Sequence, residues 1–157
     1  MLQRIALAVA GLALGAAQTQ AANVHFVEGP NFSINDDLTV SCTGKLAGLG
    51  NKDIRIVVEA EGEATVTLFN PAGQFVPGQN KIPVVAFGEV RISKDEIKNG
   101  NVVFSLSTSS LDPGPLDPRD FGAPNVHWHA VVTDIQITSA TITVYQGGRV
   151  VLQETFP

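Results

Sequence analysis

The chain has 157 residues, with 10 lysines and arginines against 15 aspartates and glutamates, so its formal net charge is −5. This balance disfavours nucleic acids and anionic lipid surfaces as partners, because both are held by clustered basic residues and the sequence has no such cluster. The single cysteine, Cys42, excludes an internal disulfide, so the fold must rest on packing.

Residues 1–21 are typical of a secretory signal peptide. Arg4 supplies the positive start, residues 5–17 are uncharged and apolar, and small residues follow at Ala21 and Ala22, where we expect cleavage. The alternative, a membrane anchor, needs about 20 apolar residues, which is more than this stretch provides. We therefore expect residues 22–157 to form one exported domain, extracellular or periplasmic, that is not inserted in the membrane.

Strand-like segments fill this domain. β-branched and other apolar residues alternate with polar ones, and Gly, Pro, Asn and Asp interrupt them at short intervals. The segments cover residues 23–27, 32–34, 38–46, 54–58, 64–68, 82–92, 102–106, 126–137, 141–145 and 150–152. Only residues 93–98 have helical character, because Ser93 and Glu96 fit a capping box.

Glycines and prolines mark the expected breaks. Gly29-Pro30 should end the first strand, Gly62 indicates a bend or bulge, Gly88 indicates a break, and Gly147-Gly148 predicts a hairpin turn. Residues 109–125 form the longest irregular segment, and loops of this length are either functional or poorly ordered.

The spacing of these segments predicts an all-β fold: a single antiparallel β-sandwich, immunoglobulin-like or related, with about seven to nine short strands. No strand–helix–strand alternation is present, which disfavours a parallel α/β enzyme.

Two groups of residues are candidates for metal binding. His127 and His129 would project from one face of a strand, where two imidazoles, with His25 as a third, would suit zinc or copper. Asp112, Asp117 and Asp120 in the long loop would suit Ca²⁺, although they lack the spacing of a calcium-binding loop. The simpler interpretation needs no cofactor: the histidines point outward while Trp128 fills the core, and the aspartates form turns.

Two further features have ordinary explanations. Glu59, Glu61 and Glu63 alternate, so they would share one face of an extended chain, which we interpret as a solvated outer face rather than a calcium or acid–base site. Cys42 lies on the same face as Leu38 and Val40, and we interpret it as a small buried hydrophobe rather than a nucleophile.

Four blocks appear in chain order: Lys45–Asn51, Asn70–Asn80, Lys98–Phe104 and Thr133–Val144. Together they resemble a group of small secreted proteins, mostly bacterial and uncharacterised, over nearly the whole domain. In that group cysteines often occupy the positions of Leu68 and Ala123, so the resemblance implies that a disulfide tethering the long loop is missing here. Trp128 matches the group's tryptophan, which has no neighbouring histidines. The resemblance implies no activity.

The sequence favours a secreted module that works by binding or by extracellular assembly, with a protein, a cell-surface component or a polysaccharide as its partner. Self-association through exposed strand edges is one form of such assembly. The alternative is a secreted hydrolase or metal-dependent enzyme on the same scaffold, but no catalytic motif supports it.

Overall fold

The computed structural model describes residues 23–157, so the predicted signal peptide lies outside the described residues. Strands dominate this part of the chain, which contains no α-helix. Its eight strands are β1 (His25–Ile34), β2 (Thr39–Ala47), β3 (Ile54–Phe69), β4 (Phe75–Pro77), β5 (Ile82–Ile92), β6 (Val102–Ser110), β7 (His129–Gln146) and β8 (Arg149–Phe156). Two short 3₁₀ turns, η2 (Lys94–Glu96) and η3 (Pro118–Phe121), complete it.

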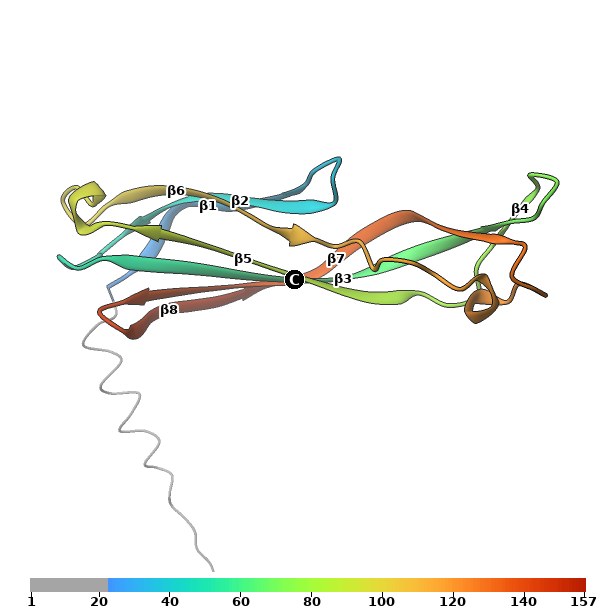
Figure 1. Cartoon of the computed structure of the whole chain (residues 1–157). Coiled ribbons are helices and arrows are strands. Elements are labelled where there is room, and N and C mark those ends of the chain that lie inside the picture. Colours follow the sequence, from blue (N-terminus) through green and yellow to red (C-terminus); the bar gives the residue numbers. More distant parts are fainter. Residues whose placement is uncertain (1–22) are drawn as a thin grey trace, which may run out of the picture.

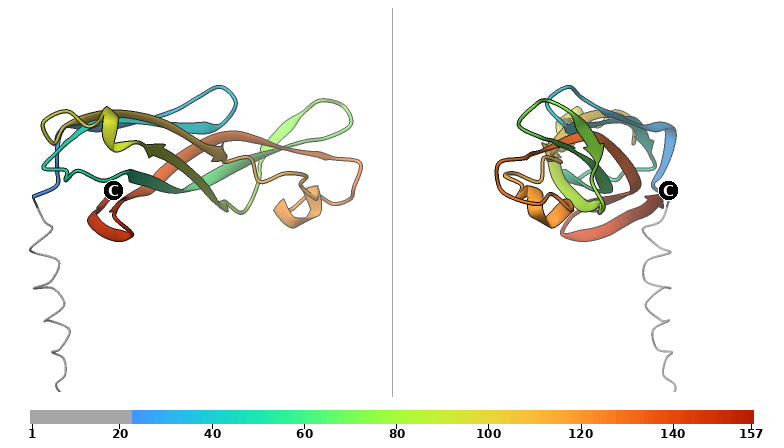
Figure 2. Two further views of the ribbon diagram at one scale, coloured as in Figure 1. Left: turned by 60° about the vertical axis from the view of Figure 1, so that its left-hand side comes forward. Right: turned by 90° about the vertical axis from the view of Figure 1, so that its right-hand side faces the viewer.

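The strands form two antiparallel sheets. One is three-stranded, in the order β1-β2-β6; the other is five-stranded, with β3 between β7 and β5, β8 outside β7, and β4 beside the end of β3. β3 and β7 pair from Ile54↔Gln146 to Phe69↔His129, and at about 3.3 Å per residue this pair spans about 50 Å. The molecule is accordingly long in one direction and narrow in the other two (Figures 1 and 2).

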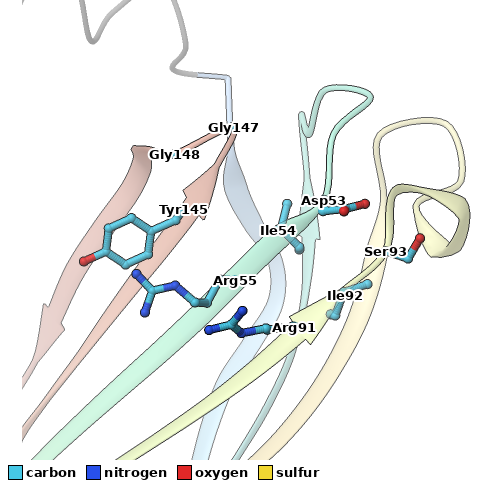
Figure 3. A pocket seen from close by; sticks show the side chains of 9 residues that line it. All are labelled: Asp53, Ile54, Arg55, Arg91, Ile92, Ser93, Tyr145, Gly147 and Gly148. Carbon is cyan, nitrogen blue, oxygen red and sulfur yellow. The ribbon is translucent and has the colours of Figure 1, made fainter.

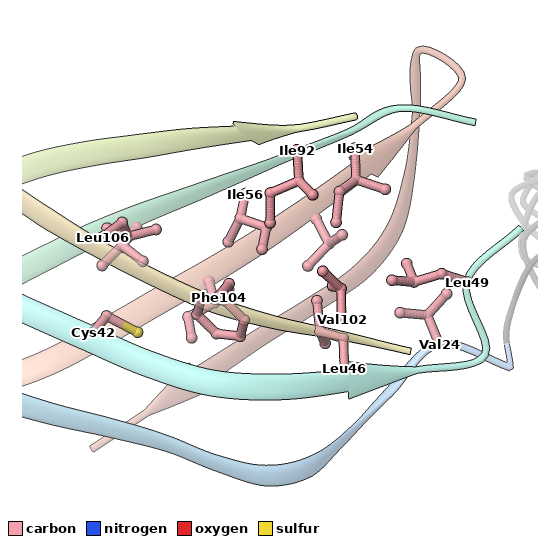
Figure 4. Close-up of a cluster of buried hydrophobic side chains, with 13 residues drawn as sticks. Val24, Cys42, Leu46, Leu49, Ile54, Ile56, Ile92, Val102, Phe104 and Leu106 are labelled. Atoms are coloured by element: carbon pink, nitrogen blue, oxygen red, sulfur yellow. The ribbon is translucent and has the colours of Figure 1, made fainter. Parts of the chain in front are cut away.

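The two sheets face each other over one half of this length. Alternate residues of β2, β3, β6 and β7 point inward and form the largest buried cluster (Figure 4). It consists of Val24, Cys42, Leu46, Leu49, Ile54, Ile56, Val58, Ile92, Val102, Phe104, Leu106, Ile142 and Val144. The predicted all-β sandwich is confirmed, with antiparallel pairing throughout the described residues.

The long loop between β6 and β7 covers the other half of the five-stranded sheet. Phe121 and Ala123 are buried against Val66 and Leu68 of β3, and Trp128 packs on the same cluster. The backbone N–H of Gln79 donates to the carbonyl of Phe121 at 3.0 Å. Apolar packing therefore attaches this loop, and Leu68 and Ala123 are both members of the cluster that does so.

Several predicted strand ends are wrong. β1 continues through Gly29-Pro30, because these two residues oppose the single Gly44 of β2 in a bulge of an edge strand, where proline is tolerated. β5 is continuous through Gly88, where β6 passes close by: a Cβ on Gly88 would lie 2.6 Å from the carbonyl oxygen of Ser107. The segments 54–58 and 64–68 are one strand, as are 129–137 and 141–145.

A capping box, a bulge and a hairpin turn were predicted correctly. Ser93 and Glu96 form the capping box at η2. The β3–β7 pairing slips by one residue next to Gly62, so this glycine does mark a bulge. Gly147 and Gly148, both with positive φ, form the β7–β8 hairpin turn.

Candidate functional site

The three histidines do not come together. His25 begins β1 at the Ile54 end of the sandwich, whereas His129 pairs with Phe69 at the other end of β3, about 50 Å away. His127 lies in a turn before β7, where its backbone N–H donates to the Asn125 side chain at 2.9 Å. His127 and His129 are exposed while Trp128 is half-buried.

Two of the three aspartates of the long loop bind its backbone through their side chains, whereas the backbone carbonyl of Asp120 accepts from the Asn80 side chain at 3.1 Å. Asp112 accepts from the N–H of Gly114, and Asp117 accepts from the N–H of Arg119, each at 2.9 Å. Asp117 also pairs with the Arg119 guanidinium, which lowers the pKa of this carboxyl to about 2. Among residues 23–157, no three or more His, Cys, Asp or Glu side chains are grouped so that they could hold a metal ion.

Cys42 is fully buried in the main cluster. Burial raises the pKa of its thiol to about 12, so the thiolate that a nucleophile requires is not populated at neutral pH. The interpretation of Cys42 as a buried hydrophobe agrees with this placement.

The most distinctive polar arrangement lies on the outer face of the five-stranded sheet. We use "outer face" for the side on which Arg55, Val57, Glu59, Glu61 and Glu63 of β3 alternate with buried residues. Arg55 is directly opposite Arg91 on β5 and directly opposite Tyr145 on β7, so these three side chains form one row across three strands (Figure 3).

Contacts within the row hold Arg55 in place. Its guanidinium carbon lies 4.2 Å from the centre of the Tyr145 ring, a cation–π contact. Arg55 Nη1 and Arg91 Nε each donate to the Glu89 carboxylate at 3.2 Å, and these two arginines lower the pKa of Glu89. Glu89 therefore bridges two cations that would otherwise repel each other.

The row borders an open hollow of about 490 Å³. Asp53, Ser93, Gly147 and Gly148 contribute to its wall beside the two arginines and Tyr145 (Figure 3). Arg91 has 77 % of its side chain exposed, and its terminal nitrogens are not used by Glu89. The hollow thus presents guanidinium donors next to an aromatic ring.

A pair of like charges directly opposite each other on adjacent strands normally lowers sheet stability. Arg55 and Arg91 break this rule on a face where most other positions are neutral or acidic. Such local conflicts are expected where a residue is retained for binding rather than for folding. The arginine pair is accordingly the best candidate for a functional site in residues 23–157.

Comparison with known proteins gives no match: no protein-family model, no curated protein and no solved structure is significantly similar to this chain. Within residues 23–157, no helix has the length and apolar character that a membrane span requires.

Sequence reasoning missed this site. Arg55, Arg91 and Tyr145 come from three strands that are far apart along the chain, and none belongs to a motif. Only the register of β3 with β5 and β7 brings them together. The signal within the sequence was limited to two arginines at outward-facing positions of strand-like segments.

Proposed function

We propose that this chain is an exported binding module whose outer face recognises carboxylate groups through Arg55 and Arg91. Export is supported by residues 1–21, and the mass of the mature protein would test it. The observation that carries the binding proposal is the Arg91–Arg55–Tyr145 row at the edge of an open hollow.

The chemistry of the row suits carboxylates. A guanidinium presents paired N–H donors with the geometry of a carboxylate, and charge-assisted hydrogen bonds of this type are the strong ones. The Tyr145 ring is covered on one face by the Arg55 guanidinium, so it holds this donor in place beside the ligand.

Because the site is open to water, we expect it to bind a single carboxylate only weakly. Two guanidinium groups in water-accessible positions gain only modest Coulomb energy from a single carboxylate. In a ligand that carries many carboxylates, a second carboxylate can bind as soon as the first one dissociates, and this raises the overall affinity. The favoured ligand class is therefore a polymer or a surface with repeated carboxylates.

Calorimetric titration with oligogalacturonate, a repeating uronic acid, tests the proposal at low salt. We expect binding to the wild-type protein, at least tenfold weaker binding to Arg91→Gln, and no binding of the fully methyl-esterified oligomer. Lys45→Gln removes one positive charge from the three-stranded sheet and serves as the matched control.

Two results would overturn the proposal. One is equal binding of the esterified and free-acid oligomers, because binding would then not depend on the negative charge of the ligand. The other is an equal loss of affinity in Arg91→Gln and Lys45→Gln, because only net charge would then matter.

A further inference from the structure

The outer face is divided by charge along its length. Arg55 and Arg91 occupy the end near Ile54, whereas Glu59, Glu61 and Glu63 follow along β3 toward the other end. Asp134, opposite Thr65 on β7, extends the acidic row. Glu89 beside the arginines and Lys81, which pairs with Glu63 at 3.4 Å, reduce both charges. One face of one sheet nevertheless carries a net basic end and a net acidic stretch.

The acidic stretch also has a hollow. It measures about 720 Å³ and is lined by Glu61, Glu63, Pro83, Val85 and Thr138. The outer face therefore borders two open hollows, one lined by Arg55 and Arg91 together with Asp53, and one lined by Glu61 and Glu63.

Exposed apolar side chains lie beside the acidic stretch. Phe87, directly opposite Glu59, is 54 % exposed, and Val85, directly opposite Glu61, is 48 % exposed. Phe87 and Val85 are neighbours on the same side of β5, so they form a small apolar patch that is available to a partner.

We propose that the outer face is the interface of a weak two-fold dimer, in which a second copy of this chain lies face to face and antiparallel. The inference rests on the proposed function, because it gives Arg55 and Arg91 their carboxylates: those of Glu61 and Glu63 in the second copy.

Two-fold symmetry follows from having both charged regions on the same face. When two such faces meet with parallel long axes, like charges oppose each other. Reversing one copy places the basic end of each over the acidic stretch of the other, and both contacts form at once. The assembly then closes as a dimer, because neither charged region is left for a third copy.

The strand register identifies the centre of this interface. Arg55 precedes Glu59 by four residues and Glu63 follows it by four, so an axis through the Glu59–Phe87 row places Arg55 opposite Glu63. Phe87 then meets Phe87 of the second copy near the axis. Glu59 meets its own counterpart there, a repulsion that keeps the dimer weak.

The area of the face agrees with a reversible contact. Only β3, β5 and β7 continue on both sides of the axis, because β8 ends at Phe156, opposite Ala140. Three strands about 4.8 Å apart, over about eight residues each, cover about 400 Å² per copy. The total of about 800 Å² is in the range of weak, transient contacts, so we expect a dimer that dissociates readily.

Sedimentation velocity across protein concentration measures this equilibrium in the mature chain. We expect monomer and dimer with no larger species, and at least a tenfold weaker dimer when the ionic strength rises from about 20 to about 500 mM, where exposed charges are screened. A chain that stays monomeric to about 500 µM in low salt, or one that grows beyond a dimer, would overturn the inference.

A charge exchange identifies the face. Arg55→Glu and Glu63→Arg should each abolish the dimer, because each places like charges together at both contacts. An equimolar mixture of the two variants should form a heterodimer, since both contacts again join opposite charges, and the double variant should dimerise with itself. Rescue also shows that the single variants are folded.

Matched controls carry the same charge reversals elsewhere. Lys45→Glu lies on the three-stranded sheet and Asp36→Arg in the β1–β2 turn, and both should dimerise as the wild type does. Failure of the mixture to dimerise would place any wild-type dimer on another face.

The oligogalacturonate titration separates this inference from the proposed function. Arginine-dependent binding of the oligomer by a protein that never dimerises would leave the carboxylate site standing and remove the second copy as its partner. A dimer that passes the charge exchange, in a protein that does not bind the oligomer, would restrict the site to self-recognition.

Discussion

Glu89 and the two arginines that it bridges illustrate how single side chains set the properties of the outer face. The carboxylate accepts from both guanidinium groups, so it occupies donors that a ligand carboxylate would also use. Arg91, and to a lesser degree Arg55, lowers the pKa of Glu89 below its usual value of 4.5, so Glu89 remains a charged competitor through the mildly acidic range.

Replacing this internal competitor should strengthen ligand binding. We expect Glu89→Gln to raise the affinity for oligogalacturonate by about threefold to tenfold in calorimetric titration, because the carboxylate that competes with the ligand for both guanidinium groups is removed.

Glu154→Gln makes the same change in net charge on β8 and separates this effect from a general loss of negative charge. If Glu89→Gln instead weakens binding, then Glu89 positions the arginines, and its contribution to their geometry exceeds its competition with the ligand.

At the scale of elements, the long strand β3 shows how one glycine accommodates an irregular partner. The register with β7 shifts next to Gly62, and β7 carries an extra residue there. A Cβ built on Gly62 would lie 2.5 Å from the carbonyl oxygen of Gln136, closer than real contacts allow. Backbone atoms, rather than a flexible side chain, fill this space.

We therefore expect Gly62→Ala to lower the free energy of unfolding by roughly 1–3 kcal/mol, the usual range for inserting an atom group into a packed site. Urea denaturation followed by Trp128 fluorescence measures the change as a shift of the midpoint.

Gly50→Ala is the matched control, since a Cβ at Gly50 would meet only the Gln146 side chain, at 3.4 Å. Equal stability of the two variants would mean that the β7 bulge can move away from β3 at little cost.

Local patterns in the sequence correctly predicted structural features that depend only on residues close together in the chain. The capping box at Ser93, the alternation of β6, and the irregularity at Gly62 all follow from chemistry within a few positions. A glycine in a strand-like segment has several meanings, however. Gly62 marks a bulge, whereas Gly88 allows β6 to approach an unbroken β5, and only the tertiary arrangement distinguishes the two.

The same limit explains why the candidate site was not predicted. Histidines and aspartates were the site candidates chosen from the sequence because their side chains can bind metals. The arrangement that the structure brings out consists of Arg55, Arg91 and Tyr145, which become neighbours only when β3 pairs with β5 and β7 in the observed register.

At the scale of the whole molecule, the two halves are stabilised differently. Near Ile54 the core lies between two sheets, whereas near Phe69 the five-stranded sheet is covered by the loop that carries Phe121 and Trp128. β3 and β7 connect the halves without interruption, so the domain is extended rather than round (Figure 1).

Small-angle X-ray scattering measures this shape in solution, at a protein concentration low enough that the mature chain is monomeric. A round domain of about 135 residues has a radius of gyration of about 14 Å. The 18 residues of β7 span about 60 Å, so we expect about 18 Å and a maximum dimension near 65 Å. A value near 14 Å would mean that the half covered by the loop folds back on the sandwich. Raising the protein concentration should then thicken the particle and lengthen it by only about 15–25 Å, because the axis at Glu59 lies a few residues from the middle of β3 and β7 and the antiparallel copies overlap over most of their length.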